Sequence, residues 1–193
     1  MSNTKQSLPR VGSKINDLDQ TLNNLFDPTA NLSNQADILS AEKLEKLRRS
    51  VPLKIDAQGQ WWHNQEAFTH PRLIHVFNRG LDMMNGESIV RWAGRWCYIA
   101  CEVTPFLILK LQVVHTEENT NEPPLHALLN NGECLPLAQL SVHDDILFAQ
   151  LGEHRYARFS KVAQAQCIPW LYETVDASGF ELRYNRFTWP ITS

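Results

Sequence analysis

Four side chains of the types that bind metal ions lie close together in the sequence: His63, Glu66, His70 and His75. Zinc sites commonly combine histidine and carboxylate ligands that converge on one point. Side chains five residues apart on a helix diverge by about 140° at about 3.6 residues per turn. His70 and His75 therefore cannot easily reach the same ion. We expect no metal ion and no other cofactor to be bound.

Glu102 is the carboxylate with the most suggestive surroundings, because the segment CEVTPF places apolar residues beside it. A buried carboxylate needs a partner, and Arg91 or Arg95 could provide one. Glu102 could also act with His63 as the acid–base pair of a hydrolase, provided that the two side chains lie within hydrogen-bond reach. The sequence contains no nucleophile elbow, phosphate-binding loop or metalloprotease motif. We assign no catalytic residue and keep the hydrolase as an alternative.

Basic and aromatic side chains are stronger candidates for binding a ligand. Arg72, His75 and Arg79 follow helical spacing, so they form a stripe that could meet an anionic ligand or simply face solvent. Trp61 and Trp62 point to opposite faces of a strand, so one of them needs cover from the N-terminal extension, the opposite half-domain or a ligand. Burying a tryptophan is worth roughly 5 kcal/mol at about 25 cal/mol per Å². The predicted ligand-binding residues are Trp62, His63, Arg72, Arg91, Trp96, Tyr98, Glu102 and Arg158.

The elements that would position these residues follow a pattern that occurs twice, a β-hairpin running directly into an amphipathic helix. The first copy is LKIDAQGQWWH followed by HPRLIHVFNRGLDMM, and the second is ILFAQLGEHRYARF followed by SKVAQAQCIPWLYETV. Pro169 interrupts the second helix and should break it near residues 166–168. Two copies of one unit predict an α+β fold in which two similar half-domains of mainly antiparallel sheet face each other across a cleft.

The chain divides into three parts. Residues 1–50 form a polar, partly helical N-terminal extension, with one amphipathic helix predicted over residues 14–26 and a second near residues 36–49. Residues 51–118 form the first half-domain, which the strand FLILKLQVVH closes. Residues 119–193 form the second half-domain, and the segment TEENTNEPP has the composition of a connection between the two.

Two further hairpins are predicted inside the half-domains. In ESIVRWAGRWCYIACEV a turn at Gly94-Arg95 would pair Trp92 with Cys97. This register places Arg91, Trp96 and Tyr98 on one face, and a mainly apolar set on the other: Val90, Trp92, Cys97, Ile99, Cys101 and Val103. Asn131-Gly132 is the strongest hairpin signal in the second half.

Charge and composition argue against several classes of protein. The net charge of −3 and the pI near 6.2 disfavour a nucleic acid partner, whose phosphates attract basic surfaces. No run approaches the about 18 apolar residues that would span a membrane. The N-terminus lacks the apolar core of a secretory signal, so we expect a cytoplasmic location. The four cysteines show no zinc-binding spacing and are interpreted as buried thiols.

The run IDAQGQWWH, the helix ending in LIHVFNRGLDM and the segment CEVTPF together resemble the bacterial domain-of-unknown-function family 1285, over roughly residues 51–190. The matching positions are Gly59, Trp61, His70, Val76-Phe77, Glu102 and Pro105-Phe106. The chain would be a divergent branch, because it lacks the family's fuller TP.E segment and contains Pro169. The resemblance implies a fold of two similar sheet-and-helix repeats, no catalytic residues and a role in ligand-dependent signalling.

The leading hypothesis is a cytoplasmic binding module without enzymatic activity, a small-molecule sensor or adaptor that holds its ligand between two repeats. The first alternative is the hydrolase that uses a carboxylate and a histidine. The second alternative is a protein-interaction scaffold that uses the N-terminal extension. The expected partners are a small-molecule ligand and either a protein partner or a second copy of the chain.

Overall fold

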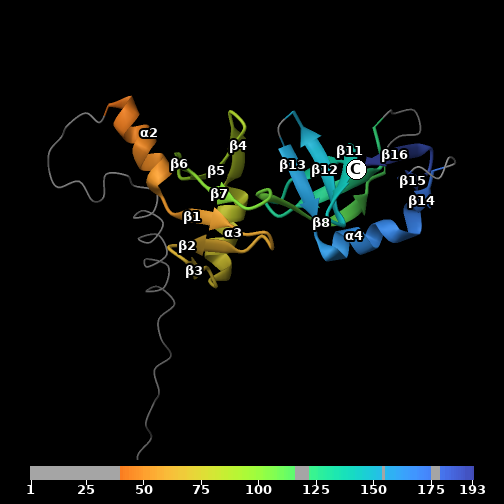
Figure 1. Ribbon diagram of the computed structural model, residues 1–193, viewed down its shortest axis with the longest axis horizontal. Coiled ribbons are helices and arrows are strands. Elements are labelled where there is room, and N and C mark those ends of the chain that lie inside the picture. The colour runs from red at the N-terminus through yellow and green to blue at the C-terminus, as the bar shows by residue number, and fades with distance from the viewer. Residues whose placement is uncertain (1–39, 116–121, 154, 175–178) are drawn as a thin grey trace, which may run out of the picture.

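The computed structural model describes residues 40–115, 122–153, 155–174 and 179–193 (Figure 1). Within these residues the protein has a mixed α+β fold made mostly of sheet, with three α-helices and one short 3-10 helix, which confirms the predicted fold class at this level. The predicted helix over residues 14–26 and most of the segment TEENTNEPP lie outside the described residues.

The N-terminal elements build two small sheets, with strand orders β3-β2-β1-β7 and β4-β5-β6. Two helices accompany them, and both sheets lie on the left of Figure 1, apart from the large sheet. The elements are α2 (Ala41–Ser50), β1 (Leu53–Ile55), β2 (Trp61–His63), β3 (Glu66–Ala67), α3 (Pro71–Arg79), β4 (Leu81–Met84), β5 (Glu87–Trp92), β6 (Arg95–Tyr98) and β7 (Ala100–Cys101).

The remaining strands form one nine-stranded sheet in the order β10-β9-β8-β13-β12-β11-β16-β15-β14. Only β8/β13 and β11/β16 are parallel pairs, so this sheet is mainly antiparallel as predicted. Its strands are β8 (Phe106–Val113), β9 (Leu125–Leu129), β10 (Cys134–Pro136), β11 (Gln139–His143), β12 (Ile146–Gly152), β13 (Arg155–Phe159), β14 (Leu171–Glu173), β15 (Phe180–Tyr184) and β16 (Phe187–Thr192). Helix α4 (Lys161–Cys167) and the 3-10 helix η1 (Ile168–Trp170) connect β13 to β14.

Strand β8 belongs to the large sheet, whereas it was predicted to close the first half-domain. Phe106 lies opposite Ala157 and Ile108 lies opposite Phe159 in the parallel pair with β13. On its other edge β8 pairs with β9. The hydrophobic alternation of FLILKLQV shows that the segment is a strand, but it does not show which sheet the strand joins. The large sheet therefore begins at Phe106, and the division of the chain into domains stays a prediction.

Both predicted hairpin-and-helix segments contain a hairpin and a helix in that order. Each helix is shorter than predicted, and the chain after it returns to strand, at β4 (Leu81–Met84) in the first segment and at β14 (Leu171–Glu173) in the second. Strands β1 and β2 precede α3, with the short strand β3 between them and the helix, and strands β12 and β13 run into α4. The first hairpin lies in a four-stranded sheet and the second lies inside the nine-stranded sheet. Because their surroundings differ in this way, the arrangement as two similar half-domains across a cleft is not confirmed.

Trp61 and Trp62 do point to opposite sides, and each has its own cover. Trp61 is 1% exposed, its ring centroid lies 5.0 Å from that of Phe77 on α3, and its Nε1 donates to Asn78 Oδ1 at 2.8 Å. Trp62 is half-buried, and its Nε1 donates to Asp56 Oδ2 at 2.8 Å. The buried face of α3 thus packs on Trp61, and the β1–β2 turn covers part of Trp62.

The β5–β6 hairpin turns one residue earlier than predicted. Ala93 and Gly94 both have positive φ, at 48° and 79°, which is the geometry of a type I′ turn. Cys97 therefore lies opposite Val90 instead of Trp92. Each residue moves by two positions along the partner strand, and the side-chain period of a strand is two, so the predicted faces of β5 and β6 are kept. The prediction is wrong for Cys101, which lies in β7 of the other small sheet, and for Val103, which is 48% exposed.

Helix α2 covers the face of β5 and β6 that carries Trp96 and Tyr98. The guanidinium of Arg48 lies 4.0 Å from the Trp96 ring centroid, and that of Arg49 lies 3.8 Å from the Tyr98 ring centroid. Helix α2 itself has no buried residue. The predicted second helix of the extension is thus present, and it attaches to the body through stacking and charge.

Helix α4 begins and ends where the sequence indicates. The Ser160 side chain accepts a hydrogen bond from the Ala163 backbone at 3.1 Å, which caps the first turn. The helix ends at Cys167, and Pro169 lies in the following 3-10 helix, which confirms the predicted break. Its buried residues Ala163 and Cys167 face the large sheet, where α4 packs on β8 and β13.

Candidate functional site

A cavity of about 710 Å³ lies where the N-terminal elements meet the nine-stranded sheet, and we call it the junction cavity. Its walls come from α3, from β4, from the β5–β6 hairpin and from Glu133, which follows the β9–β10 turn. The titratable residues in its lining are His75, Arg79, Asp82, Arg91, Arg95 and Glu133. The cavity thus brings together residues that are up to 58 positions apart in the chain, from His75 to Glu133.

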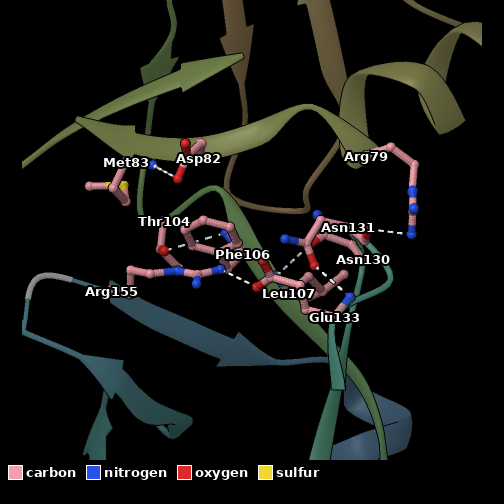
Figure 2. A network of polar contacts seen from close by, with 10 residues as sticks. All are labelled: Arg79, Asp82, Met83, Thr104, Phe106, Leu107, Asn130, Asn131, Glu133 and Arg155. Atoms are coloured by element: carbon pink, nitrogen blue, oxygen red, sulfur yellow. Dashed lines mark hydrogen bonds and ion pairs between the residues drawn. The ribbon is translucent and has the colours of Figure 1, made fainter. Parts of the chain in front are cut away.

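The β9–β10 turn is the part of the large sheet that reaches this junction. The hairpin predicted at Asn131-Gly132 is confirmed, and Gly132 has a φ of +88°, a conformation that glycine adopts without strain. Asn130 fastens the turn to the start of β8 (Figure 2). Its Oδ1 accepts from the Leu107 backbone at 3.1 Å, and its Nδ2 donates to the Pro105 carbonyl at 3.1 Å. The turn is therefore held in place by strand β8.

Arg79, the last residue of α3, reaches from the N-terminal part to this turn (Figure 2). Its Nη1 donates to the Asn131 carbonyl at 3.4 Å. A Cβ atom added to Gly132 would lie 2.7 Å from Nη1, so the glycine leaves room for the guanidinium. A guanidinium has five N–H donors, and in the described part of the chain Arg79 contacts no carboxylate. Several of its donors can therefore bind a ligand.

Arg91 on β5 lies close to the end of α3. Its Nε donates to Asp82 Oδ2 at 2.8 Å, and its backbone N–H donates to the Gly80 carbonyl at 2.8 Å. A Cβ atom on Gly80 would lie 2.1 Å from the Arg91 carbonyl oxygen, a distance that no side chain can occupy. Glycine at position 80 thus allows the helix end and the strand to approach, which places Arg91 on the wall of the cavity.

Arg155 on β13 holds Glu133 from outside the cavity (Figure 2). Its Nη2 forms an ion pair with Glu133 Oε2, and its guanidinium carbon lies 4.5 Å from the Phe106 ring centroid. The two carboxylates in the cavity wall, Asp82 and Glu133, each contact an arginine already. Three arginines against two carboxylates leave the lining of the cavity with one surplus positive charge.

The chemistry of this cluster is that of an anion site. Three arginines and a histidine line the cavity together with two carboxylates, both of which are paired. Guanidinium groups bind carboxylates and phosphates through two parallel N–H donors, with more directional specificity than an ammonium group has. The arrangement can hold and orient a small anion. It offers no nucleophile with an adjacent base.

The predicted pair of Glu102 and His63 does not form. Glu102 accepts from the Ala57 backbone at 2.9 Å and forms an ion pair with Lys54 at 3.5 Å, instead of with Arg91 or Arg95. His63 lies on the other side of β1, and the strand registers separate it from Glu102 by about 14 Å at about 3.3 Å per residue and about 4.8 Å per strand. That separation excludes Glu102 and His63 as an acid–base pair, and the wider alternative of a hydrolase with a carboxylate and a histidine stays a prediction.

The other predicted ligand-binding residues lie in several places. Trp62 is bonded to Asp56, and Trp96 and Tyr98 lie beneath α2. Arg72 is exposed in the first turn of α3 and lines neither the junction cavity nor a second cavity, of about 860 Å³, at one end of the nine-stranded sheet. Arg158 lines the second of them. Arg91 is thus the one member of the predicted set in the junction cavity, and a ligand role for the others stays a prediction.

Sequence reasoning missed the residues that the β9–β10 turn and β13 contribute. Asn130, Asn131, Glu133 and Arg155 were not predicted to be part of a site. The Asn-Gly pair indicates a hairpin, but nothing local indicates that the hairpin docks on α3. His75 and Arg79 of the predicted basic stripe do lie in the cavity wall.

Neither a metal site nor a membrane span is found within the described ranges. No group of three or more histidine, cysteine, aspartate or glutamate side chains is placed to hold a metal ion there, and the stretch from His63 to His75 is no exception. No described helix is both long and apolar enough to cross a bilayer.

The comparisons with known proteins bear on the fold. No protein-family model matches the sequence, and no curated protein matches it. The structure is similar to a crystal structure of a DUF1285 family protein from Silicibacter pomeroyi DSS-3, with a TM-score of 0.56, 10% sequence identity, and coverage of 74% of this chain and 80% of that one. A DUF1285 family protein from Shewanella baltica OS155 matches with a TM-score of 0.47, 14% identity, and coverage of 62% of this chain and 92% of that one. The predicted resemblance to DUF1285 is thus confirmed as a likeness of fold.

Proposed function

We propose that the protein is a binding module without enzymatic activity, and that it holds a small anionic molecule in the junction cavity. The observation that carries this proposal is the convergence of Arg79, Arg91 and Arg95 on one cavity of about 710 Å³. This volume lies within the range of about 300–1,000 Å³ that is usual for small-molecule sites.

Arg79 is the residue most suited to contact the ligand directly. The Nε of Arg91 already donates to Asp82. The only hydrogen bond of Arg79 to a described residue is the long one to the Asn131 carbonyl. A carboxylate or phosphate that enters the cavity would offer Arg79 a charged acceptor in place of that carbonyl. The ligand would then touch both the N-terminal part and the β9–β10 turn.

Such contacts suit a sensor or adaptor. Arg79 and Arg91 belong to the N-terminal elements, and Glu133 belongs to the large sheet. A ligand that takes the place of the Asn131 carbonyl on Arg79 alters the contact between the two parts, so ligand binding is coupled to their association. The signal that follows would be a change in how firmly the two parts are joined.

The test is a thermal-shift screen of the full chain against mono- and dicarboxylates, inorganic phosphate and organic phosphates. A ligand at about 100 times its Kd should stabilise the folded state by about 2.7 kcal/mol. Each active compound is then measured on Arg79→Gln and on Arg72→Gln. Arg72 is a matched control, because it lies on the same helix and outside the cavity.

We expect Arg79→Gln to weaken binding at least tenfold and Arg72→Gln to leave it unchanged. Equal losses in the two variants would mean that the helix carries only a general electrostatic attraction, and they would refute the site. A screen in which no anion shifts the midpoint would refute the function.

A further inference from the structure

A second cavity, of about 860 Å³, lies at one end of the nine-stranded sheet, and we call it the sheet-end cavity. Corresponding ends of several strands surround it: β11 ends there, β12 begins there, β13 ends there and β15 begins there. Helix α4 and the 3-10 helix η1 complete the wall. Strand ends that surround a hollow are a common place for ligands, as in the mouths of β-barrels.

The floor of this cavity is apolar, and so is one part of its rim. Leu147 and Phe159 line it and are 6% and 3% exposed, so they connect it to the main core. At its rim Ile168, Leu171 and Phe180 are 68%, 41% and 53% exposed. Apolar side chains that gather around a hollow and face water mark a binding surface more often than scattered ones do. A ligand with an apolar body would cover them.

The charged residues at the rim suggest that such a ligand also carries a charged group at one end. Arg158 and Lys161 line the cavity on the side where β13 runs into α4, and neither forms an ion pair with a described residue. Asp144 and Asp145 lie on the β11–β12 turn of the same rim. The Asp145 carbonyl accepts from Gln164 of α4 at 2.9 Å, which fixes the turn against the helix.

We propose that the sheet-end cavity binds an amphipathic carboxylic acid, with its alkyl chain on the apolar floor and its carboxylate beside Arg158 and Lys161. The rim offers two cations on the α4 side, and Arg158 can pair with a carboxylate through two N–H donors. This site is separate from the junction cavity and shares no lining residue with it. The two sites take different ligands, because one is lined by arginines and the other by apolar side chains.

The test uses dodecanoic acid and its uncharged counterpart dodecanol, titrated against the full chain by displacement of a fluorescent fatty acid. We expect saturable binding of the acid at one site per chain, at least tenfold tighter than binding of the alcohol. Phe180→Glu should weaken the binding of both compounds at least tenfold. Arg158→Gln should remove most of the preference for the acid while the alcohol binds as before.

Val162→Glu is the matched control, because Val162 is a 66% exposed apolar residue on α4 that does not line the cavity. It should bind the acid as the unchanged protein does. Equal losses in Val162→Glu and Phe180→Glu would overturn the site, since they would show a general effect of surface charge. Equal affinity for acid and alcohol would overturn the assigned carboxylate contact. Circular dichroism of each variant establishes that it is folded.

Discussion

Arg49 of helix α2 and Glu87 of strand β5 form a two-point ion pair, with both Nη1 to Oε1 and Nη2 to Oε2 at 2.7 Å. Arg49 also stacks on Tyr98, so one side chain provides charge, two hydrogen bonds and ring contact. Helix α2 buries no residue of its own, and these contacts attach it to the body together with the one between Arg48 and Trp96 and the hydrogen bond between the Tyr98 and Glu45 side chains. The attachment should therefore respond to charge and salt.

Glu87→Gln should loosen helix α2. The variant removes the charge that Arg49 meets on β5, and exposed ion pairs are weakened by salt as well. We expect faster proteolytic cleavage within Ala41–Ser50 at low salt, and a smaller difference from the unchanged protein at high salt. Glu42→Gln serves as the control, because it removes a pair with Lys46 inside the same helix. Similar cleavage in both variants would show that β5 does not hold the helix.

Acid should weaken the same contact. The hydrogen bonds from Arg49 lower the pKa of Glu87 below its usual 4.5. As the pH falls the unfolded chain therefore binds this proton first, so the contribution to stability is complete above about pH 4.5 and is lost below it. Thermal midpoints between about pH 3 and 6 should fall less steeply in Glu87→Gln than in the unchanged protein. Parallel curves would contradict the assignment.

The four cysteines should react in a definite order. The prediction of four buried thiols is wrong for Cys134, which is exposed, and Cys101 is only partly buried. Cys97 and Cys167 are buried, and burial raises the pKa of both to about 12. The thiolate is the reactive form, so a thiol reagent near neutral pH should modify Cys134 first and the buried pair only after unfolding. Because the folded pKa of the pair exceeds the usual 9.0, their contribution to stability is full below pH 9.0 and is lost as the pH rises towards about 12. Cys134→Ser should abolish the fast phase.

Trp61→Phe should destabilise the protein more than Trp62→Phe. The first change leaves the Asn78 amide oxygen without its donor beside the core, which costs about 1–3 kcal/mol. The second affects a half-buried contact with Asp56, whose carboxylate keeps hydrogen bonds from the Gln58 and Gln60 backbone. Urea unfolding of the two variants measures the difference. An equal loss would mean that Asn78 finds another donor.

Gly80→Ala should strongly disturb the junction. Its Cβ would meet the Arg91 carbonyl, so either the end of α3 or strand β5 must move, at a cost of about 3 kcal/mol. Gly179→Ala is the control, because a Cβ there meets no atom within 4 Å. Unfolding midpoints should fall for the first variant and hardly change for the second. A mild effect at Gly80 would show that the contact between α3 and β5 can adjust.

Local signals in the sequence predict the elements well. The turn at Asn131-Gly132, the capping Ser160 and the break at Pro169 are each decided by a few neighbouring residues, and each is confirmed. The faces of β5 and β6 were also predicted, although the turn lies at Ala93-Gly94. Side-chain alternation carries that information even when the register is wrong by an even step.

These local signals could not predict contacts between segments that are distant in the sequence. The apolar alternation of Phe106–Val113 is satisfied equally by either sheet, so it could not show that β8 joins β13. Glu102 forms an ion pair with Lys54 beside the parallel strands β1 and β7, and no local sequence pattern predicts that these strands pair. The junction cavity needs α3, β5 and the β9–β10 turn together, so its residues are gathered only by the complete fold.

The parallel pairing of β8 with β13 also has a consequence for the order in which the chain can fold. Phe106 and Ala157 are 51 residues apart, so the pair closes a long loop. During synthesis at about 5–20 residues per second, one edge of β8 stays unpaired for roughly 3–10 seconds until β13 has been synthesised. An apolar strand with an open edge is a template for wrong pairing. Chains truncated before Phe159 should therefore aggregate, because the open edge of β8 is covered only after β13 has been synthesised.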